Sequence, residues 1–177
     1  DQKQHLEVTR DIVTAFHTAY GVEVFTTPEP LIHDEVAVVP GIDGRKMSKS
    51  YGNTVDIFGP EKATRKRIMS VVTDSTPVEE PKPTGDNALY ELLKVFAPAE
   101  ERDEVERAFR EGGVGYGELK KRLFGYFMDT FGEARARYEE LGRNPGEVDE
   151  VLAAGARRAR EEVGTLMERV RRAVGVR

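Results

Sequence analysis

A proline-rich stretch at residues 73–86 divides the sequence into two parts with different hydrophobic patterns. Before it, short β-branched runs alternate with helical periodicity, which is typical of an α/β fold. After it, apolar residues recur at helical spacing, which predicts an all-α region. Neither pattern can continue through the stretch, because each proline removes a backbone donor and keeps the preceding residue out of the helical region. The sequence therefore predicts an α/β part over residues 1–75 and a helical part over residues 76–177.

The first part carries one helical pattern, then two strand patterns, then a second helix. Residues 1–20 have apolar side chains at helical spacing, and Gly21 is a typical helix end. The short runs 22–27 and 35–40 are rich in valine and predict strands, the second buried on both faces. Pro60 predicts the start of the next helix. Its buried side is expected to carry Ile68, Met69, Val71 and Val72.

The second part is predicted to be a bundle of helices. Asp74 and Ser75 are expected to cap a helix end, and Asp86 is the expected cap of the helix that follows it. Acidic residues open the next helix after Pro98. Two longer amphipathic helices complete the chain, each with one apolar stripe expected to face the core. The first stripe comprises Leu119, Leu123, Tyr126, Phe127, Phe131, Ala134, Tyr138 and Leu141. The second, within residues 147–174, comprises Val151, Leu152, Ala159, Val163, Leu166, Val170 and Val174.

Residues 41–53, here called the lysine loop, place two lysines and two serines between glycines, in the order GIDGRKMSKSYGN. The loop follows directly after the second predicted strand, where ligands bind in open α/β sheets. Lysine is almost never buried unpaired, so these ammonium groups are expected at the surface. The loop is therefore either a solvated turn or a clamp for a polyanion such as the phosphates of a nucleotide.

Charge is high but unevenly distributed. The chain has 27 Lys and Arg against 32 Asp and Glu, a formal net charge of −5, which argues against a protein that coats nucleic acid through total charge. Residues 151–177, however, hold 7 Arg and 3 Glu. Arg157, Arg158 and Arg160 project away from the apolar stripe of the last helix. They form either a solvated face or a contact for an RNA backbone.

Composition also excludes several classes of site. The chain has no cysteine, and its three histidines are well separated, so we expect no metal site in the protein. His17 and His33 are expected to be surface or packing residues. No run approaches the roughly 18 apolar residues of a membrane span, and no signal-peptide pattern is present, which favours a cytoplasmic protein. The sequence begins with Asp1 rather than Met, so we expect it to be the later part of a longer polypeptide.

Five segments resemble the tryptophanyl-tRNA synthetase family, in matching order and spacing over nearly the whole chain. The segment KMSKS, Lys46 to Ser50, matches the second signature of class I aminoacyl-tRNA synthetases without a mismatch. The other matching segments are DQKQHLEVTRD at the start, VTDS at 72–75, GYGELKKRL, and LAAGARRAREEVGTLMERVRRAVG near the end. The resemblance implies the later part of a Rossmann-type catalytic domain, followed by a helical domain on the anticodon side of the tRNA.

The resemblance also implies an activity and a set of roles. The family activates tryptophan with ATP and Mg²⁺ and transfers it to tRNA(Trp), and its members are homodimers. It implies that Lys46 and Lys49 stabilise the leaving phosphates, and that Met47 offers backbone groups to the adenine. It further implies an ATP site that includes Asp1 (on the ribose), Lys46, Met47, Ser48, Lys49 and Ser50, with Gln2 beside the amino-acid carboxylate. The Mg²⁺ would arrive with the ATP.

Two features of the family are missing from the chain. None of the three histidines has a glycine two residues later, so the family's first signature is not present. The acidic residue that reads the indole N–H is also missing. We therefore expect the chain alone to be inactive. Tyrosyl-tRNA synthetase remains the rival enzyme, and a helical module that binds tRNA or protein without catalysis is the rival from another class.

Overall fold

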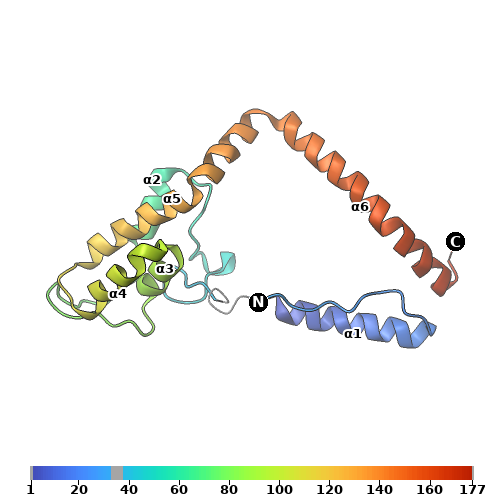
Figure 1. Ribbon diagram of the computed structural model, residues 1–177, viewed down its shortest axis with the longest axis horizontal. Coiled ribbons are helices and arrows are strands. Elements are labelled where there is room, and N and C mark those ends of the chain that lie inside the picture. The colour runs from blue at the N-terminus through green and yellow to red at the C-terminus, as the bar shows by residue number, and fades with distance from the viewer. Residues whose placement is uncertain (1, 33–37, 177) are drawn as a thin grey trace. The chain divides into compact units, whose positions relative to one another are not determined.

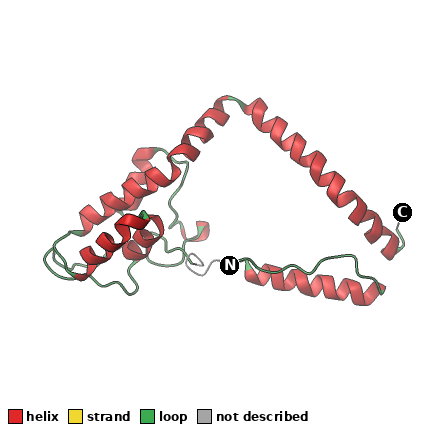
Figure 2. Cartoon of the chain, in the orientation of Figure 1, coloured by secondary structure: helices red, strands yellow, loops and turns green. Residues whose placement is uncertain are grey.

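The computed structural model describes residues 2–32 and 38–176, and within these ranges it contains helices and no strand (Figures 1 and 2). The chain forms two compact units, of which unit 1 comprises residues 1–32 with 143–177 and unit 2 comprises residues 33–142. The helices are α1 (Lys3–Tyr20), α2 (Glu61–Met69), α3 (Ala88–Phe96), α4 (Arg102–Arg110), α5 (Tyr116–Arg143) and α6 (Pro145–Val174), with 3₁₀ turns η2 (Lys49–Tyr51) and η3 (Ala99–Glu101). The all-α class predicted for residues 76–177 is confirmed in the described residues. The α/β class predicted for residues 1–75 is not, because the described residues of that part contain helices and no strand. In the described ranges, no helix combines the length and apolar composition that crossing a membrane requires.

In unit 1, the predicted strand at residues 22–27 is wrong. The chain leaves α1 at Gly21, whose φ of 62° suits glycine, and runs back beside the same helix (Figure 1). His17 Nε2 accepts hydrogen bonds from the N–H groups of Val24 (3.2 Å) and Phe25 (3.1 Å), and Arg10 donates to the carbonyl of Pro28 (3.2 Å). These backbone groups find partners on the helix rather than on a neighbouring strand, which satisfies them without a sheet. His17 is therefore a packing residue.

The prediction that α6 buries its apolar stripe is also wrong. No residue of this helix is fully buried, and Val151 and Leu152 keep 65% and 64% of their surface exposed. Ala159 and Val163 are exposed as well. Leu166, Val170 and Val174 are half-buried in the last turns, where Arg169 donates to the carbonyl of Glu23 (3.0 Å). Of the predicted stripe, only these three residues are partly buried, in the part of α6 that carries the contact to Glu23.

Unit 2 is built around a hydrophobic core contributed by α2 to α5. Its fully buried residues are Ile68, Val71, Leu89, Leu93, Val105, Phe109, Leu119 and Leu123. The predicted stripe of α5 is confirmed for its first half, including Tyr126 and Phe127. Farther along, Phe131 and Leu141 are half-buried, while Ala134 and Tyr138 are exposed. Val72, expected on the buried side of α2, lies beyond the end of that helix and is 51% exposed.

The proline-rich segment packs against the helices that follow it. Lys82 is buried, with 4% of its surface exposed, and its N–H donates to the carbonyl of Phe109 (2.7 Å). Its ammonium group donates to the carbonyls of Pro77, Val78 and Glu80 at 3.3–3.4 Å, so the charge is surrounded by oxygen atoms. The segment is thus held in place by its own carbonyls and by α4.

Two predicted helix caps are wrong. Asn87, not Asp86, caps α3: its Oδ1 accepts from the N–H of Tyr90 (3.1 Å), while Asp86 takes a positive φ of 53° in the preceding turn. Asp74 caps no helix end, because its carboxylate accepts from the N–H of Thr76 (2.8 Å) and the hydroxyl of Tyr116 (2.9 Å). The first error arises because the neighbours Asp86 and Asn87 compete for the same cap, and the turn geometry decides between them. The predicted strand at 35–40 and His33 lie largely outside the described residues.

Candidate functional site

The lysine loop has a closed, hydrogen-bonded base. The N–H of Met47 donates to the carbonyl of Val39 (2.8 Å), and the N–H of Gly41 donates to the carbonyl of Arg45 (2.7 Å). Pro40 and Lys46 form an isolated antiparallel bridge. These bonds join residues 39–41 to residues 45–47, so the KMSKS lysines project from a fixed turn.

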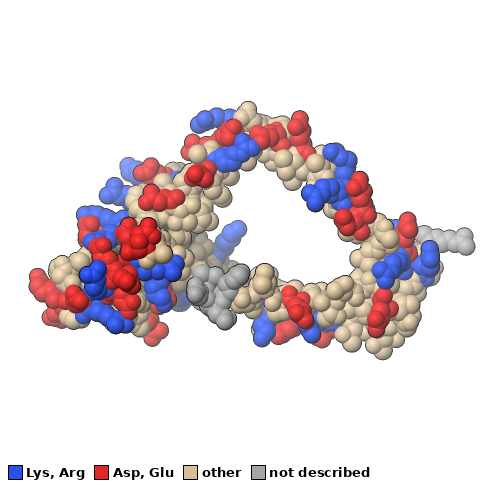
Figure 3. Space-filling model, viewed as in Figure 1, with Lys and Arg blue, Asp and Glu red and all other residues tan. Residues whose placement is uncertain are grey.

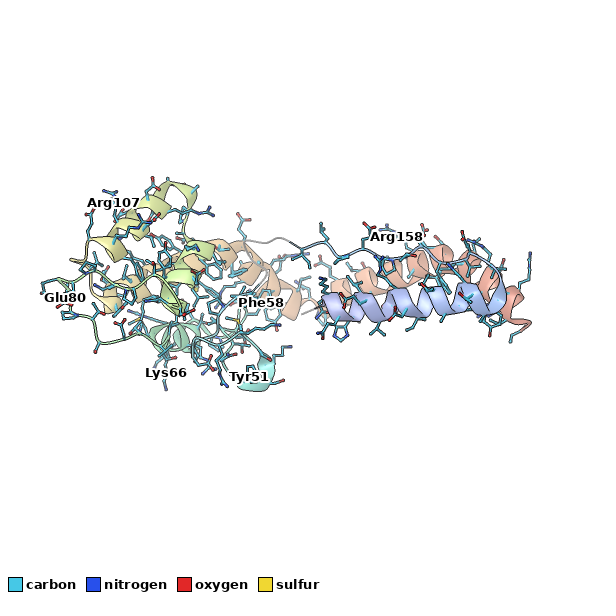
Figure 4. All side chains as sticks on the ribbon, turned by 90° about the horizontal axis from the view of Figure 1, so that it is seen from below. Tyr51, Phe58, Lys66, Glu80, Arg107 and Arg158 are labelled. Atoms are coloured by element: carbon cyan, nitrogen blue, oxygen red, sulfur yellow. The ribbon has the colours of Figure 1, made fainter. Side chains whose placement is uncertain are left out.

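The tip of the loop is a single 3₁₀ turn, η2. Ser48 begins it, with its Oγ accepting from the N–H of Ser50 (3.3 Å), and Gly52 ends it with a φ of 62°. Lys46, Lys49 and Ser50 are exposed, whereas Met47 and Ser48 are half-buried. Tyr51 lies at the surface of unit 2, where the guanidinium of Arg45 stacks over its ring at 4.7 Å (Figure 4). The arrangement presents ammonium and hydroxyl groups to solvent from an ordered backbone.

The half-buried side chain of Met47 faces the apolar side of unit 2. It lines an apolar pocket of about 100 Å³ together with Val39, Ile57, Ile68 and Phe127. Val39 and Ile42, on the near side of the signature, pack against the hydrophobic core and join the loop to the helices of unit 2.

Three residues that the sequence interpretation missed organise the loop: Asp43, Asn53 and Arg67. The side-chain amide of Asn53, 2% exposed, donates to Asp43 Oδ1 (2.7 Å). Asp43 also pairs with the guanidinium of Arg45 at 2.7 Å. Arg67 of α2 donates to the carbonyls of Gly52 and Thr54 (3.0 Å for the latter). The sequence did offer one sign of this role, namely the asparagine that follows Gly52. A polar residue in a glycine-rich loop often forms hydrogen bonds with the nearby backbone.

The other predicted site residues lie elsewhere. Asp1 is outside the described residues. Gln2 is exposed just before α1, in unit 1, whereas the lysine loop belongs to unit 2. Arg157, Arg158 and Arg160 are exposed on α6 (Figure 4 labels Arg158). On the visible face of unit 2, acidic and basic side chains are interspersed (Figure 3). In the described part of the chain, no three His, Cys, Asp or Glu residues gather as a metal site would require.

We expect the carboxyl group of Asp43 to titrate below its ordinary pKa of 3.8, mainly because the Asn53 amide donates to its charged form. Its contribution to the loop is then complete above pH 3.8 and is lost as the pH falls through the lowered pKa. Carboxyl ¹³C NMR should show that Asn53→Ala moves this pKa back upward. An unchanged pKa in that variant would contradict the assigned cause.

Among protein families, the chain matches the model described as tRNA synthetases class I (W and Y) over residues 1–132. Among curated proteins, the chain is 44% identical to a tryptophan–tRNA ligase of Fusobacterium nucleatum over 99% of its length. It is 46% identical to one of Rhodopirellula baltica over 100% of its length. These matches cover 54% and 55% of the two proteins, so the chain spans about half the length of the curated relatives it matches.

Among solved structures, the chain is similar to a tryptophanyl-tRNA synthetase of Campylobacter jejuni crystallised with ADP and tryptophan. The TM-score is 0.81 at 40% identity, covering 99% of this chain and 55% of the other. A second structure, of tryptophanyl-tRNA synthetase from the same organism, gives a TM-score of 0.80. The fold of the described residues is therefore one that occurs in proteins of this type.

Proposed function

The chain belongs to the class I tRNA synthetases of the tryptophan and tyrosine type, and we propose that the full-length protein is a tryptophan–tRNA ligase. The observation that carries the proposal is the exposed lysine pair on the ordered lysine loop, in a chain whose curated relatives are named tryptophan–tRNA ligases. Tyrosyl-tRNA synthetase is the second candidate within the same family. The relatives' names favour tryptophan.

In the proposed reaction, a carboxylate oxygen of tryptophan attacks the α-phosphorus of ATP. The bond from that phosphorus to the bridging oxygen breaks, and pyrophosphate leaves with the electron pair. Lys49, with Lys46 assisting, stabilises the charge that develops on the departing phosphates. The aminoacyl group then passes from the adenylate to a hydroxyl of the tRNA, and AMP leaves.

The remaining contacts of the proposed site follow from the groups that the loop leaves available. The N–H of Met47 is already bonded to Val39, so its carbonyl oxygen is the group that would meet the adenine amino group. The hydroxyls of Ser48 and Ser50 would donate to phosphate oxygens. Asp1 would accept from the ribose, and Gln2 would lie beside the tryptophan carboxylate. Mg²⁺ would be held by the ATP phosphates rather than by a protein cage.

We further propose that residues 1–75 end a Rossmann-type catalytic domain and that residues 76–177 form the helical domain on the anticodon side. The protein would act in the cytoplasm as a homodimer. The domain boundary stays a prediction. Ile68 and Leu89, on either side of it, belong to the same hydrophobic core of unit 2.

The decisive experiment is ATP–pyrophosphate exchange by the full-length gene product with each of the twenty amino acids in turn. We expect exchange with tryptophan alone, followed by aminoacylation of tRNA(Trp). Exchange that depends on tyrosine would establish the second candidate. No exchange with any amino acid, from a folded protein, would favour the non-catalytic module.

For the tRNA contact, charge reversal of Arg157, Arg158 or Arg160 to Glu should raise the KM for tRNA and leave tryptophan activation unchanged. Each lost phosphate contact should reduce the slope of log affinity against log salt by about 0.7–0.9. Arg107→Glu, at an exposed position of α4, is the matched control. A tRNA KM that stays constant in all three variants would leave these arginines as a solvated face.

A further inference from the structure

The most buried polar side chain of the lysine loop belongs to Asn53, and it bonds to three parts of that loop. Its Nδ2 donates to Asp43 Oδ1 (2.7 Å) and to the carbonyl of Lys46 (3.0 Å), while its Oδ1 accepts from the N–H of Ser48 (2.8 Å). One amide thus fixes Asp43, the backbone of the first lysine and the serine that directly precedes the second lysine. Both of its N–H donors are used, so the side chain has a single well-satisfied orientation.

The surroundings of Asn53 hold this amide in place. A side-chain carbon at Gly41 would lie 2.3 Å from its Nδ2, so the glycine provides the space that the amide occupies. The backbone carbonyl of Asn53 accepts from the N–H of Ile42 (3.0 Å). Arg67 donates to the carbonyls of Gly52 and Thr54, the residues on either side. Asn53 is therefore held from α2 and in turn holds the backbone that carries the lysines.

We call the three side-chain bonds of Asn53 the brace. The brace matters because a lysine side chain does little to fix the position of its own charge. Its ammonium sits on a flexible four-carbon stem, so preorganisation of the charge has to come from the backbone. Ser48, bonded to Asn53, immediately precedes Lys49 and caps the turn that begins there. We propose that Asn53 is a positioning residue for adenylyl transfer, which sets the backbone of Lys46 to Lys49 through its buried amide. The proposal rests on the proposed function, since it assigns the lysines to ATP.

The test compares two buried asparagines in the full-length protein. Asn53→Asp keeps the shape but replaces the donor with an acceptor, which then faces the carbonyl of Lys46 and the carboxylate of Asp43. Asn87→Asp is the matched control. Asn87 is also buried, at 8% exposed, and bonds to the N–H of Tyr90 and the carbonyl of Pro83, away from the lysine loop.

In tryptophan-dependent exchange, Asn53→Asp should lower kcat by about 10- to 100-fold and raise the KM for ATP, because the lysines are displaced from the phosphates. The KM for tryptophan should stay within about twofold of wild type, since Gln2, the contact proposed for tryptophan, takes no part in these bonds. Lowering the pH should partly restore kcat, because a protonated Asp at position 53 regains a donor. Asn87→Asp should show none of these changes.

Hydrogen exchange of the peptide covering residues 46–54 gives a second readout that needs no substrate. It should be faster in Asn53→Asp and unchanged in Asn87→Asp. If the wild-type protein catalysed ATP–pyrophosphate exchange with another amino acid, the tryptophan assignment would be overturned. The ratio of the kcat of Asn53→Asp to that of wild type, measured with that amino acid, would still test the role of Asn53. The brace is overturned if Asn53→Asp retains wild-type kcat and KM for ATP, or if peptide 46–54 keeps its protection.

Discussion

Lys49→Ala should lower the rate of tryptophan activation in the full-length protein by roughly 10²- to 10³-fold, the loss typical of removing one preorganised donor. The ammonium of Lys49 is exposed and sits at the first residue of η2, directly after the braced Ser48. Its charge would act mainly on the leaving pyrophosphate. Removing it therefore raises the free energy of the transition state more than that of the ground state. As a result, kcat falls while the affinity for tryptophan is unchanged.

Single-turnover formation of the adenylate would measure this rate, and equilibrium binding would measure the affinity for tryptophan. Lys62→Ala on α2 is the matched control, since Lys62 is an exposed lysine of the same unit that lies outside the lysine loop. Lys46→Ala should give a smaller loss than Lys49→Ala. If Lys49→Ala instead weakened tryptophan binding at an unchanged rate, the phosphate role would be wrong.

The sequence predicts the chemical groups that the lysine loop exposes better than the hydrogen bonds that hold the loop in shape. Lys46, Lys49 and the two serines follow from residue type, because exposed ammonium and hydroxyl groups need no knowledge of packing. The brace at Asn53 could not be predicted, since its three bonds depend on how the chain turns at Gly41 and Gly52. Hydrogen-bond partners separated by up to ten residues are set by that turn rather than by local preference.

The same distinction explains the outcome for the fold. The helical pattern of α5 is confirmed where its stripe meets α3 and α4, through Leu119, Leu123 and Phe127. The valine-rich run 22–27 has strand propensity, but it forms a strand only if another strand is available to pair with it. Here His17 accepts hydrogen bonds from the N–H groups of Val24 and Phe25 instead. A periodic pattern shows which face of α6 is apolar. It does not show which apolar surface, if any, covers that face.

The second large effect concerns the core that supports the loop. Phe109 of α4 is completely buried, and its ring packs against that of Tyr90 with centroids 4.9 Å apart. Its carbonyl also accepts from the N–H of Lys82, which joins the proline-rich segment to the helices. Phe109→Ala should destabilise unit 2 by about 3–5 kcal/mol, because the lost burial is compounded by a cavity that rigid neighbours cannot close.

Phe58→Ala is the matched control for this change. Phe58 is 44% exposed and stacks on Tyr138 with centroids 4.5 Å apart, so its removal should cost about 0.5–1.5 kcal/mol. The denaturant dependence of hydrogen exchange in residues 88–127 would report the opening of unit 2 within the full-length protein. Equal losses in the two variants would contradict a core centred on Phe109. A larger loss in Phe109→Ala that also speeds hydrogen exchange in residues 46–54 would mean that the helices stabilise the lysine loop, as expected from the packing of Val39 and Ile42 against this core.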